Sequence, residues 1–150
     1  MASLFAALYL CQVHTCLDEG ISMGENIDYS KKAFLIVGTH ADDDREKATM
    51  TFACAGAASA LGIKTSVFLT GDGVKLAQKG YAEKLEPIKG MAPVKELLDA
   101  FINSGGKVQV CIPCLEARGI DKGQFMECVE FINLMDFAAA AVEVDRVFTC

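Results

Sequence analysis

Short apolar runs alternate with helical segments along most of this chain. Residues 33–38 form an uninterrupted apolar run that ends at a glycine, a pattern typical of a strand buried on both faces of a sheet. Residues 63–69 are rich in β-branched and aromatic side chains, and residues 107–111 follow a Gly-Gly pair. Both segments predict strands. Two more strands are predicted over residues 129–132 and 146–149.

The segments between these strands predict helices. Residues 45–61 are rich in alanine and end before Gly62, a residue type that often terminates helices. Pro93 is expected at the first position of a second long helix, where its missing N–H costs little. Apolar residues of that helix recur on one face at helical spacing: Val94, Leu97, Leu98, Phe101 and Ile102. Weaker patterns predict shorter helices around residues 74–79, 115–118, 121–128 and 134–142.

Strands that alternate with helices favour a parallel sheet covered on both faces. We therefore predict an α/β fold, a three-layer α/β/α sandwich around a mostly parallel sheet of about five strands. A chain of 150 residues is long enough to bury the core of one such domain without disulfides. We place that domain at residues 32–150.

Residues 1–31 are predicted to be an N-terminal extension. Residues 1–16 are apolar. A signal peptide has Lys or Arg before its apolar run, and none precedes this one. The run is also too short to span a bilayer. We expect a short helix that packs on the domain or on a neighbouring subunit. The alternative is that Met23 is the natural start and the first 22 residues are an appendage.

Charge and cysteine usage restrict the class of protein. The formal net charge is −6 and the basic residues are scattered, which argues against nucleic acid as the main partner. Seven cysteines are an odd number, and the domain is too large and apolar to need a secreted disulfide framework. We expect a cytoplasmic protein without a membrane segment, with Cys54 and Cys128 in its core.

The most informative motif is the C-x-x-C pair Cys111 and Cys114 at the end of the third predicted strand, where α/β proteins gather reactive groups. It permits a thioredoxin-type redox pair, half of a zinc site, or a nucleophilic thiolate at Cys111 with Cys114 as helper, resolving thiol or spectator. Two buried structural thiols are the plainest alternative. Zinc is disfavoured because there is no second C-x-x-C and the two histidines are far apart in sequence, so we predict no metal and no cofactor.

Three further side chains are candidates for the same site. Arg118 lies within two helical turns of Cys111 and would stabilise a thiolate or persulfide anion, unless it forms a surface ion pair with Glu116 or Asp121. His40 follows the first strand and is a candidate base or hydrogen-bond partner, although a solvated loop histidine is more common. Asp72 follows the second strand and would line the same rim as Cys111, in a Gly-x-Gly segment that otherwise predicts a turn.

Residues 32–150 contain an ordered set of motifs that resembles the DsrE/DsrF-like family, which includes TusD-type and YchN-type proteins. The G-G-x-V-x-V-C segment followed by Arg-Gly is the most specific of them. The full set is Phe34–Val37, Thr51–Ala58, Leu61–Gly62, Val67–Val74, Pro93–Phe101, Gly105–Gly106, Val108–Cys111, Arg118–Gly119 and Asp145–Val147.

The resemblance implies sulfur relay, in which a cysteine accepts a sulfane sulfur as a persulfide and passes it to a partner. In TusD-like members the active cysteine ends the strand after the glycine-rich turn, which matches Cys111. Cys114 is not part of the TusD pattern, so a Cys111–Cys114 disulfide cycle stays open. The resemblance also implies sulfur donor and acceptor proteins as partners. It further implies assembly into trimers or hexamers of identical or related subunits.

Sequence reasoning thus leads to three hypotheses. The first is a sulfurtransferase or sulfur carrier that uses Cys111. The second is a thiol–disulfide oxidoreductase or redox sensor that uses both thiols. The third is a non-catalytic oligomeric binding module whose cysteines are structural.

Overall fold

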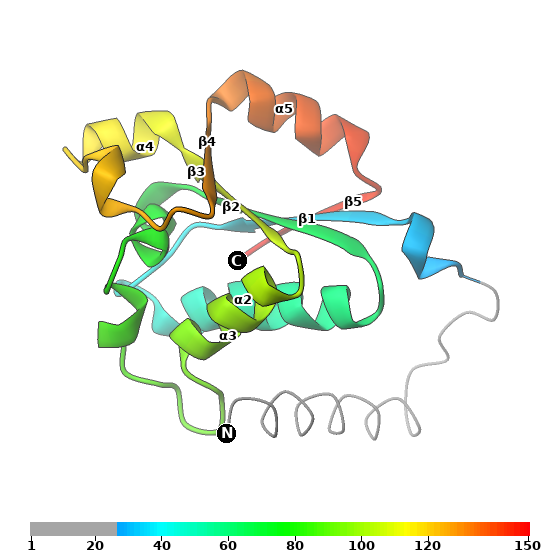
Figure 1. Cartoon of the computed structure of the whole chain (residues 1–150), viewed down its shortest axis with the longest axis horizontal. Helices are drawn as coiled ribbons and strands as arrows, with labels where there is room; N and C mark the ends of the chain where they lie inside the picture. The colour runs from blue at the N-terminus through cyan, green and yellow to red at the C-terminus, as the bar shows by residue number, and fades with distance from the viewer. Residues whose placement is uncertain (1–26) are drawn as a thin grey trace.

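A sheet of five parallel strands forms the centre of the domain (Figure 1). The computed structural model describes residues 27–150. The strands lie in the order β4-β3-β2-β1-β5, so β4 and β5 are the two edges. All five predicted strands are confirmed: β1 (Ala33–Gly38), β2 (Lys64–Leu69), β3 (Lys107–Cys111), β4 (Val129–Ile132) and β5 (Arg146–Thr149).

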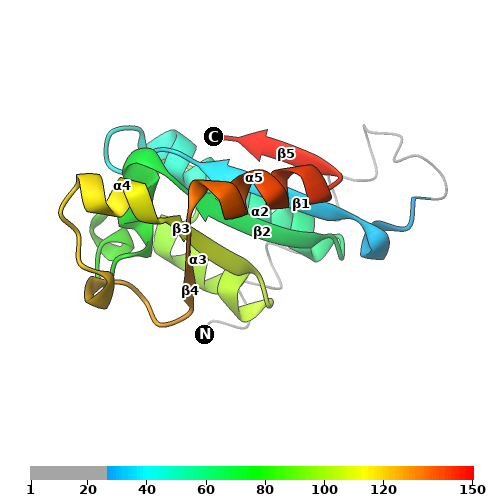
Figure 2. The same cartoon turned by 90° about the horizontal axis from the view of Figure 1, so that it is seen from above.

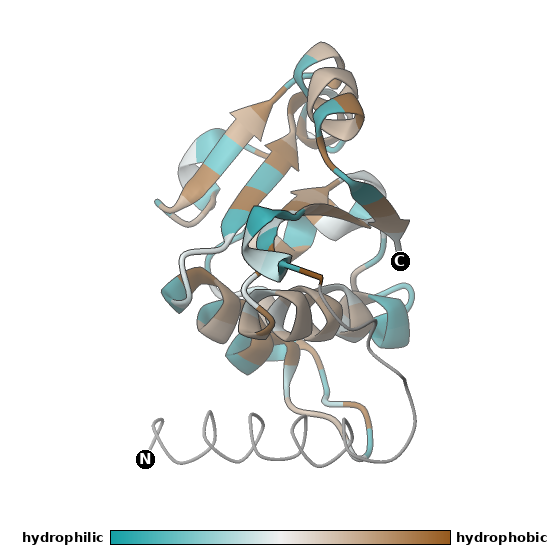
Figure 3. Ribbon diagram, turned by 90° about the vertical axis from the view of Figure 1, so that its right-hand side faces the viewer, coloured by the Kyte–Doolittle hydropathy of each residue, from teal (hydrophilic) through white to brown (hydrophobic). Residues whose placement is uncertain are grey.

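Helices cover both faces of the sheet, as Figures 1 and 2 show. Helices α2 (Arg45–Ala60) and α3 (Val94–Asn103) lie on one face, and α5 (Leu134–Glu143) lies on the other. The side view separates these three layers clearly (Figure 3). The short helix α4 (Ile112–Ala117) continues directly from β3. The prediction of a three-layer α/β/α sandwich is confirmed, and the sheet is parallel throughout.

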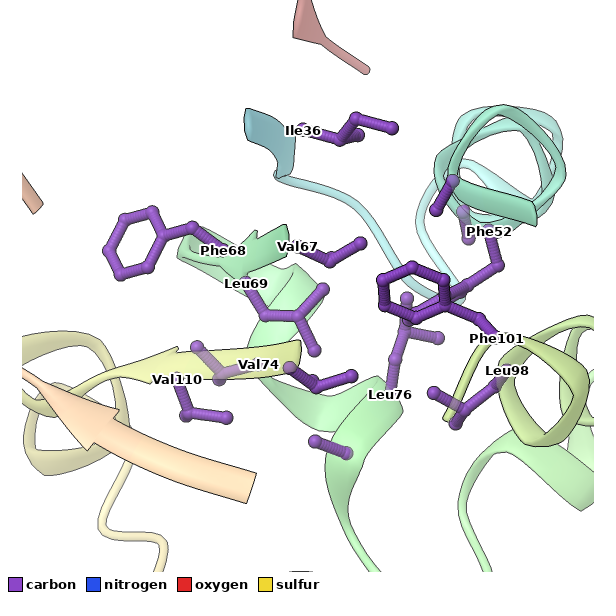
Figure 4. Close-up of a cluster of buried hydrophobic side chains, with 14 of the residues drawn as sticks. Ile36, Phe52, Val67, Phe68, Leu69, Val74, Leu76, Leu98, Phe101 and Val110 are labelled. Carbon is purple, nitrogen blue, oxygen red and sulfur yellow. The ribbon is translucent and has the colours of Figure 1, made fainter. Parts of the chain in front are cut away.

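Apolar side chains of the sheet and of α2 and α3 form the core (Figure 4). The rings of Phe52 and Phe101 join the two helices at a centroid distance of 6.4 Å. On the opposite face, Phe68 of β2 stacks on Phe137 of α5 at 4.3 Å. The fully buried residues with large side chains are Phe52, Phe68, Phe101, Leu35, Ile36, Leu69, Leu76, Leu98, Val67, Val74, Val108 and Val110.

Local sequence signals set the ends of the main helices. The Asp44 carboxylate accepts the backbone N–H of Lys47 and caps α2, and Gly62 follows the helix with a φ of +81°. Asn133 and Asp136 form a capping box at the start of α5. The prediction that Pro93 is the first helical residue is wrong by one position. Its ψ of 142° is extended, so Pro93 is the N-cap of α3.

Other expectations about the connecting segments need correction. The helix predicted over residues 121–128 is wrong, because only a 3-10 turn, η4 (Lys122–Gln124), forms there. Asp121 accepts the backbone N–H of Gly123 and favours a turn, and the next residue after η4, Phe125, is drawn into the core. Cys128, predicted to be in the core, is exposed, and Cys54 is only partly buried.

The segment after β2 forms the 3-10 helix η2 (Gly71–Ala77), which begins earlier than the short helix predicted over residues 74–79. Its glycines permit a close approach to the end of β1. A Cβ at Gly73 would lie 2.4 Å from the carbonyl oxygen of Gly38, and one at Gly71 would lie 3.0 Å from the carbonyl oxygen of Thr39. Gly71 also has a φ of +55°. The two glycines of the Gly-x-Gly segment therefore allow η2 to pack closely against the end of β1.

Replacing Gly73 by Ala is expected to destabilise the domain, because the new methyl group would collide with backbone atoms. We expect a loss of about 1–3 kcal/mol in the free energy of unfolding, measured by urea denaturation. The matched control is Gly56→Ala, in the middle of α2, where a Cβ meets nothing within 4 Å and helix propensity favours alanine. Equal stability of the two variants would contradict this account of η2.

The N-terminal extension is described only from residue 27 onward. The helix predicted for its apolar part lies outside the described residues. The 3-10 turn η1 (Tyr29–Lys31) immediately precedes β1. Within residues 27–150, no helix has the length and apolarity needed to cross a bilayer.

Candidate functional site

Two cysteines and the loop after β2 meet at the carboxyl ends of the sheet strands. Strands β2 and β3 are parallel neighbours, so their carboxyl ends lie side by side. Leu69 pairs with Val110, which brings the next residues along the two strands, Thr70 and Cys111, beside each other. The chain turns from Cys111 directly into α4, whose first turn contains Pro113 and Cys114. The predicted C-x-x-C pair therefore faces the loop that begins η2.

The two thiols differ in exposure. The side chain of Cys111 is 0% exposed and belongs to the hydrophobic core. Cys114 lies one helical turn later and is partly exposed, although it also packs against the core. A molecule in solution can therefore approach Cys114 more readily than Cys111.

The sulfur of Cys114 lies among hydrogen-bonding groups. Its Sγ is 3.2 Å from the hydroxyl oxygen of Thr70, and the backbone N–H of Gly71 donates to it over 3.4 Å. Such donors stabilise a thiolate more than a neutral thiol, because charge-assisted hydrogen bonds are the stronger ones.

These surroundings move the two thiol pKa values in opposite directions. Burial raises the pKa of Cys111, and its hydrogen bond to Cys114 raises it further. Burial also raises the pKa of Cys114, but this effect is outweighed. The hydrogen bonds from Cys111, Thr70 and Gly71, together with the positive charge of Arg118, bring the pKa of Cys114 below its usual value. The pair therefore has one thiol suited to ionise and one suited to keep its proton.

Arg118 is held beside this pair by Asp72. Its Nε and one terminal nitrogen lie 2.9 Å and 2.5 Å from the same Asp72 oxygen, and its other terminal nitrogen donates to the carbonyl of Cys114 over 3.0 Å. The ion pair predicted as an alternative, with Glu116 or Asp121, is not the one that forms. Arg118 thereby ties α4, which contains Cys114, to η2, which contains Asp72.

The network continues away from the thiols along the surface. Lys75 binds Asp72 at 2.9 Å and Asp42 at 3.2 Å, and the hydroxyl of Tyr81 also donates to Asp42. Burial first, and then the hydrogen bond to Asp42, raise the pKa of Tyr81 to about 12. The hydrogen bonds from Lys75 and Arg118 lower the pKa of Asp72. Both acids are therefore ionised at neutral pH.

His40 lies on the loop after β1 and is occupied by residues of its own loop. Its Nδ1 is 2.7 Å from the hydroxyl of Thr39, and its Nε2 is 3.8 Å from a carboxylate oxygen of Asp43. No hydrogen bond joins its ring to either thiol among residues 27–150. The geometry thus gives no support to its predicted role as a base, which stays a prediction.

A carboxylate cluster lies at the same end of the sheet. Asp42, Asp43 and Asp72 bring oxygens within 4.8 Å of one another, as a hard cation would require. Lys75 and Arg118 already bind two of these three acids. We therefore assign no metal to the cluster, and within residues 27–150 neither thiol belongs to a group of three candidate metal ligands.

Sequence reasoning missed the groups that contact Cys114 directly. Thr70 and Gly71 lie in a segment for which the sequence predicts only a turn. Lys75 and Tyr81, which extend the network through Asp72 and Asp42, have no predicted role. The available signal was that Thr70 directly follows β2, the strand before β3 in the chain, since consecutive strands in such folds are often neighbours. Asp72 and Arg118 were both predicted, but their ion pair was not.

Comparisons with known proteins agree with this architecture. The model of the DsrE/DsrF-like family matches residues 32–150. The chain belongs to the DsrE/DsrF-like family. Two archaeal relatives of this DsrE/DsrF-like protein have names that give no activity. MK0008 of Methanopyrus kandleri is 32% identical over 112 residues, which are 75% of this chain and 88% of the relative. MJ0989 of Methanocaldococcus jannaschii is 31% identical over 116 residues, or 77% and 97% of the two chains.

Solved structures show the same fold. The YchN protein of E. coli superposes with a TM-score of 0.67 and 22% identity, covering 79% of this DsrE/DsrF-like chain and 99% of its own. BT1422 of Bacteroides thetaiotaomicron superposes with a TM-score of 0.59 and 16% identity, covering 83% and 100%. At this level of identity the likeness concerns the fold.

Proposed function

We propose that this protein is a sulfur carrier that accepts a sulfane sulfur as a persulfide on the C-x-x-C pair and passes it to a partner protein. The observation that supports this most is the environment of Cys114. Its sulfur is partly exposed and faces Thr70, Gly71 and Cys111, with the charge of Arg118 nearby. The family to which the chain belongs is linked to sulfur relay, which agrees with this use of a reactive thiol.

We assign the first attack to Cys114 rather than to Cys111. The sequence pattern favoured Cys111 because it ends the strand after the glycine-rich turn. The geometry favours Cys114, because Cys111 has no exposed surface and its pKa is raised by burial. A sulfur donor in solution or on a partner protein can reach Cys114 without opening the core. Arg118 and Asp72 are proposed to position this thiol.

The proposed transfer has two steps. The Cys114 thiolate attacks the terminal sulfur of a donor persulfide, so that a new S–S bond forms and the donor thiolate leaves. A nucleophile of the acceptor then attacks the terminal sulfur and takes it over, and the Cys114 sulfur leaves as a thiolate. Both steps favour a thiol whose pKa is near or below ambient pH, because Cys114 is first nucleophile and then leaving group.

The test is the intact mass of the reduced protein after incubation with glutathione persulfide. We expect a gain of one sulfur atom, removal of that atom by cyanide, and its transfer to an added acceptor thiol. A chain that gains no sulfur under these conditions, with both thiols still reduced, would contradict the proposal and favour structural cysteines.

A second candidate function is that of a thiol–disulfide oxidoreductase or redox sensor. The observation in its favour is the placement of the two thiols three residues apart across the start of α4. In that case mild oxidant would remove two hydrogens from the protein, and a persulfide donor would add no sulfur.

Assembly into a homo-oligomer or with related subunits is proposed from the surface around α5 and β5. Apolar side chains there are unusually exposed: Leu134, Met135 (83%), Val142 (86%) and Val147. Brown, hydrophobic positions are visible along α5 in Figure 3. Large exposed apolar areas mark interaction surfaces, and a trimer or hexamer would cover this one.

The test is the mass of the particle in solution, measured by sedimentation. It should be a multiple of the chain mass for the wild type and a smaller mass for the double variant Met135→Glu/Val142→Glu. A monomeric wild type would contradict this.

We propose a cytoplasmic location. The five cysteines among residues 27–150 are all unpaired, and a persulfide chemistry needs reduced thiols. The proposed partners are therefore sulfur donor and acceptor proteins of a reducing compartment, and not nucleic acid or membrane.

A further inference from the structure

Cys111 has no task in a simple sulfur carrier. Its sulfur is enclosed by the core, so neither a donor nor an acceptor can reach it directly. It is nonetheless only three residues from Cys114, the residue that we propose to hold the persulfide, across the start of α4. A thiol in that place has a chemical consequence, because it lies next to an activated S–S bond.

We propose that this protein also releases sulfide: Cys111 attacks the inner sulfur of the Cys114 persulfide, forms a Cys111–Cys114 disulfide and expels the terminal sulfur. This inference rests on the proposed function, since it requires a persulfide on Cys114. It adds a second outcome for the bound sulfur when no acceptor takes it.

The step is balanced without any further reactant. A bond forms between the two Sγ atoms, and the bond between the Cys114 Sγ and the terminal sulfur breaks. The two cysteine sulfurs are oxidised to a disulfide, and the sulfane sulfur is reduced to sulfide. The proton of the Cys111 thiol goes to the leaving sulfur, which departs as hydrogen sulfide. A dithiol reductant of the cell is needed only to restore the two thiols for another turnover.

The geometry suits an attack within one chain. Cys111 and Cys114 are three residues apart across the start of α4, a spacing that places side chains on the same side of a helical turn. The hydroxyl of Thr70 lies 3.2 Å from the Cys114 sulfur, and the pairing of Leu69 with Val110 brings Thr70 beside Cys111 as well. Closing the disulfide therefore needs a rotation of side chains and not a rearrangement of the sheet.

Burial also confines Cys111 to this reaction. Of the other partly buried cysteines among the described residues, Cys54 lies in α2 and Cys150 follows β5, which β1 and β2 separate from β3. Because Cys111 keeps its proton more firmly than an ordinary thiol, its attack should be slow at neutral pH and faster as pH rises. The delay gives an acceptor protein time to take the sulfur first.

The test is a single turnover of the full chain without acceptor. Reduced protein is loaded with glutathione persulfide, whose leaving group is glutathione and not sulfide, and is then freed of small molecules. Trapped sulfide and intact mass are followed over time. We expect one sulfide per loaded chain and a final mass two hydrogens below the reduced protein, with a rate that increases with pH.

Three variants decide the result. Cys111→Ser should keep the added sulfur, with release slower by roughly 100-fold, because the intramolecular attack is lost. Cys111→Ala should behave alike, which separates the lost thiol from any effect of a buried hydroxyl on folding. Cys128→Ser, at an exposed position away from the site, should release sulfide as the wild type does.

Two outcomes would overturn the inference. A wild type that holds its persulfide without releasing sulfide would show that Cys111 does not attack, and the sulfur-carrier function would still stand. Equal release from Cys111→Ser would show that a thiol other than Cys111, of the same chain or of a second one, attacks the persulfide. If neither wild type nor Cys111→Ser gains sulfur from the donor, the proposed function fails, and the inference fails with it.

Discussion

Replacing Cys114 by Ser is expected to abolish the formation of the sulfur adduct. Cys114 is the thiol that is partly exposed and has its pKa lowered, so its removal leaves only the enclosed Cys111 at the site. The intact mass after incubation with glutathione persulfide should equal that of the untreated variant. In the wild type, the same treatment should first add one sulfur atom, before any of it is released as sulfide.

The matched control is Cys111→Ser, which removes the other member of the pair. It should gain the sulfur as the wild type does, because the groups that face Cys114 from the loop after β2, Thr70 and Gly71, are unchanged. A serine hydroxyl can also replace the hydrogen bond from the Cys111 thiol. The opposite pattern, with loading lost in Cys111→Ser and kept in Cys114→Ser, would return the persulfide to Cys111 as the sequence pattern suggested.

Replacing Thr70 by Val is expected to slow the reaction of Cys114 at neutral pH. The hydroxyl of Thr70 lies 3.2 Å from the Cys114 sulfur, and valine has a similar shape without the donor. A hydrogen bond to a charged group contributes about 1.5–3 kcal/mol, so its loss should raise the pKa of Cys114. The thiolate fraction, and with it the alkylation rate, should fall roughly tenfold.

The measurement is the rate of alkylation of Cys114 by iodoacetamide as a function of pH. It is made in the Cys111→Ser background, where the tryptic peptide of residues 108–118 contains a single thiol. Thr70→Ser is the control, because it keeps the hydroxyl and should restore most of the rate. If Thr70→Val leaves the midpoint of the pH profile unchanged, then the hydroxyl does not stabilise the thiolate.

Much of the fold follows from the sequence because the sheet is parallel and covered on both faces. Strands in such a sheet are short runs rich in apolar, β-branched and aromatic residues, and all five were predicted from runs of this kind between helical segments. The wrong predictions lie where contacts of individual side chains override the local preference for a helix. Residues 121–128 contain a helix-like pattern, but Gly123 sits in a turn capped by Asp121, and burial of Phe125 fixes the chain beyond it.

The chemistry of the site was predicted in part. The C-x-x-C pair and the neighbouring Arg118 are local in sequence, so their proximity could be inferred. The difference in burial between Cys111 and Cys114 could not, because it depends on how η2 packs over the end of β3. That packing requires Gly71 and Gly73 to approach the residues after β1, which no local pattern reveals.

The partners of the predicted charged residues illustrate the same limit. Asp72 and Arg118 are 46 positions apart, and the structure brings them within hydrogen-bonding distance because β2 and β3 are neighbours. His40 also follows a strand, but β1 lies one strand further from the thiols. A residue's position directly after a strand therefore indicates correctly that it lies at the carboxyl ends of the strands. It does not indicate whether the residue contacts the reactive sulfur.

The location of the added sulfur is the most direct test of the central claim. Wild-type protein should be loaded with glutathione persulfide, alkylated within seconds, and digested, and the peptide of residues 108–118 should be fragmented in the mass spectrometer. We predict that the extra sulfur lies on Cys114. A peptide with the extra sulfur on Cys111, or one that never gains sulfur, would contradict the account.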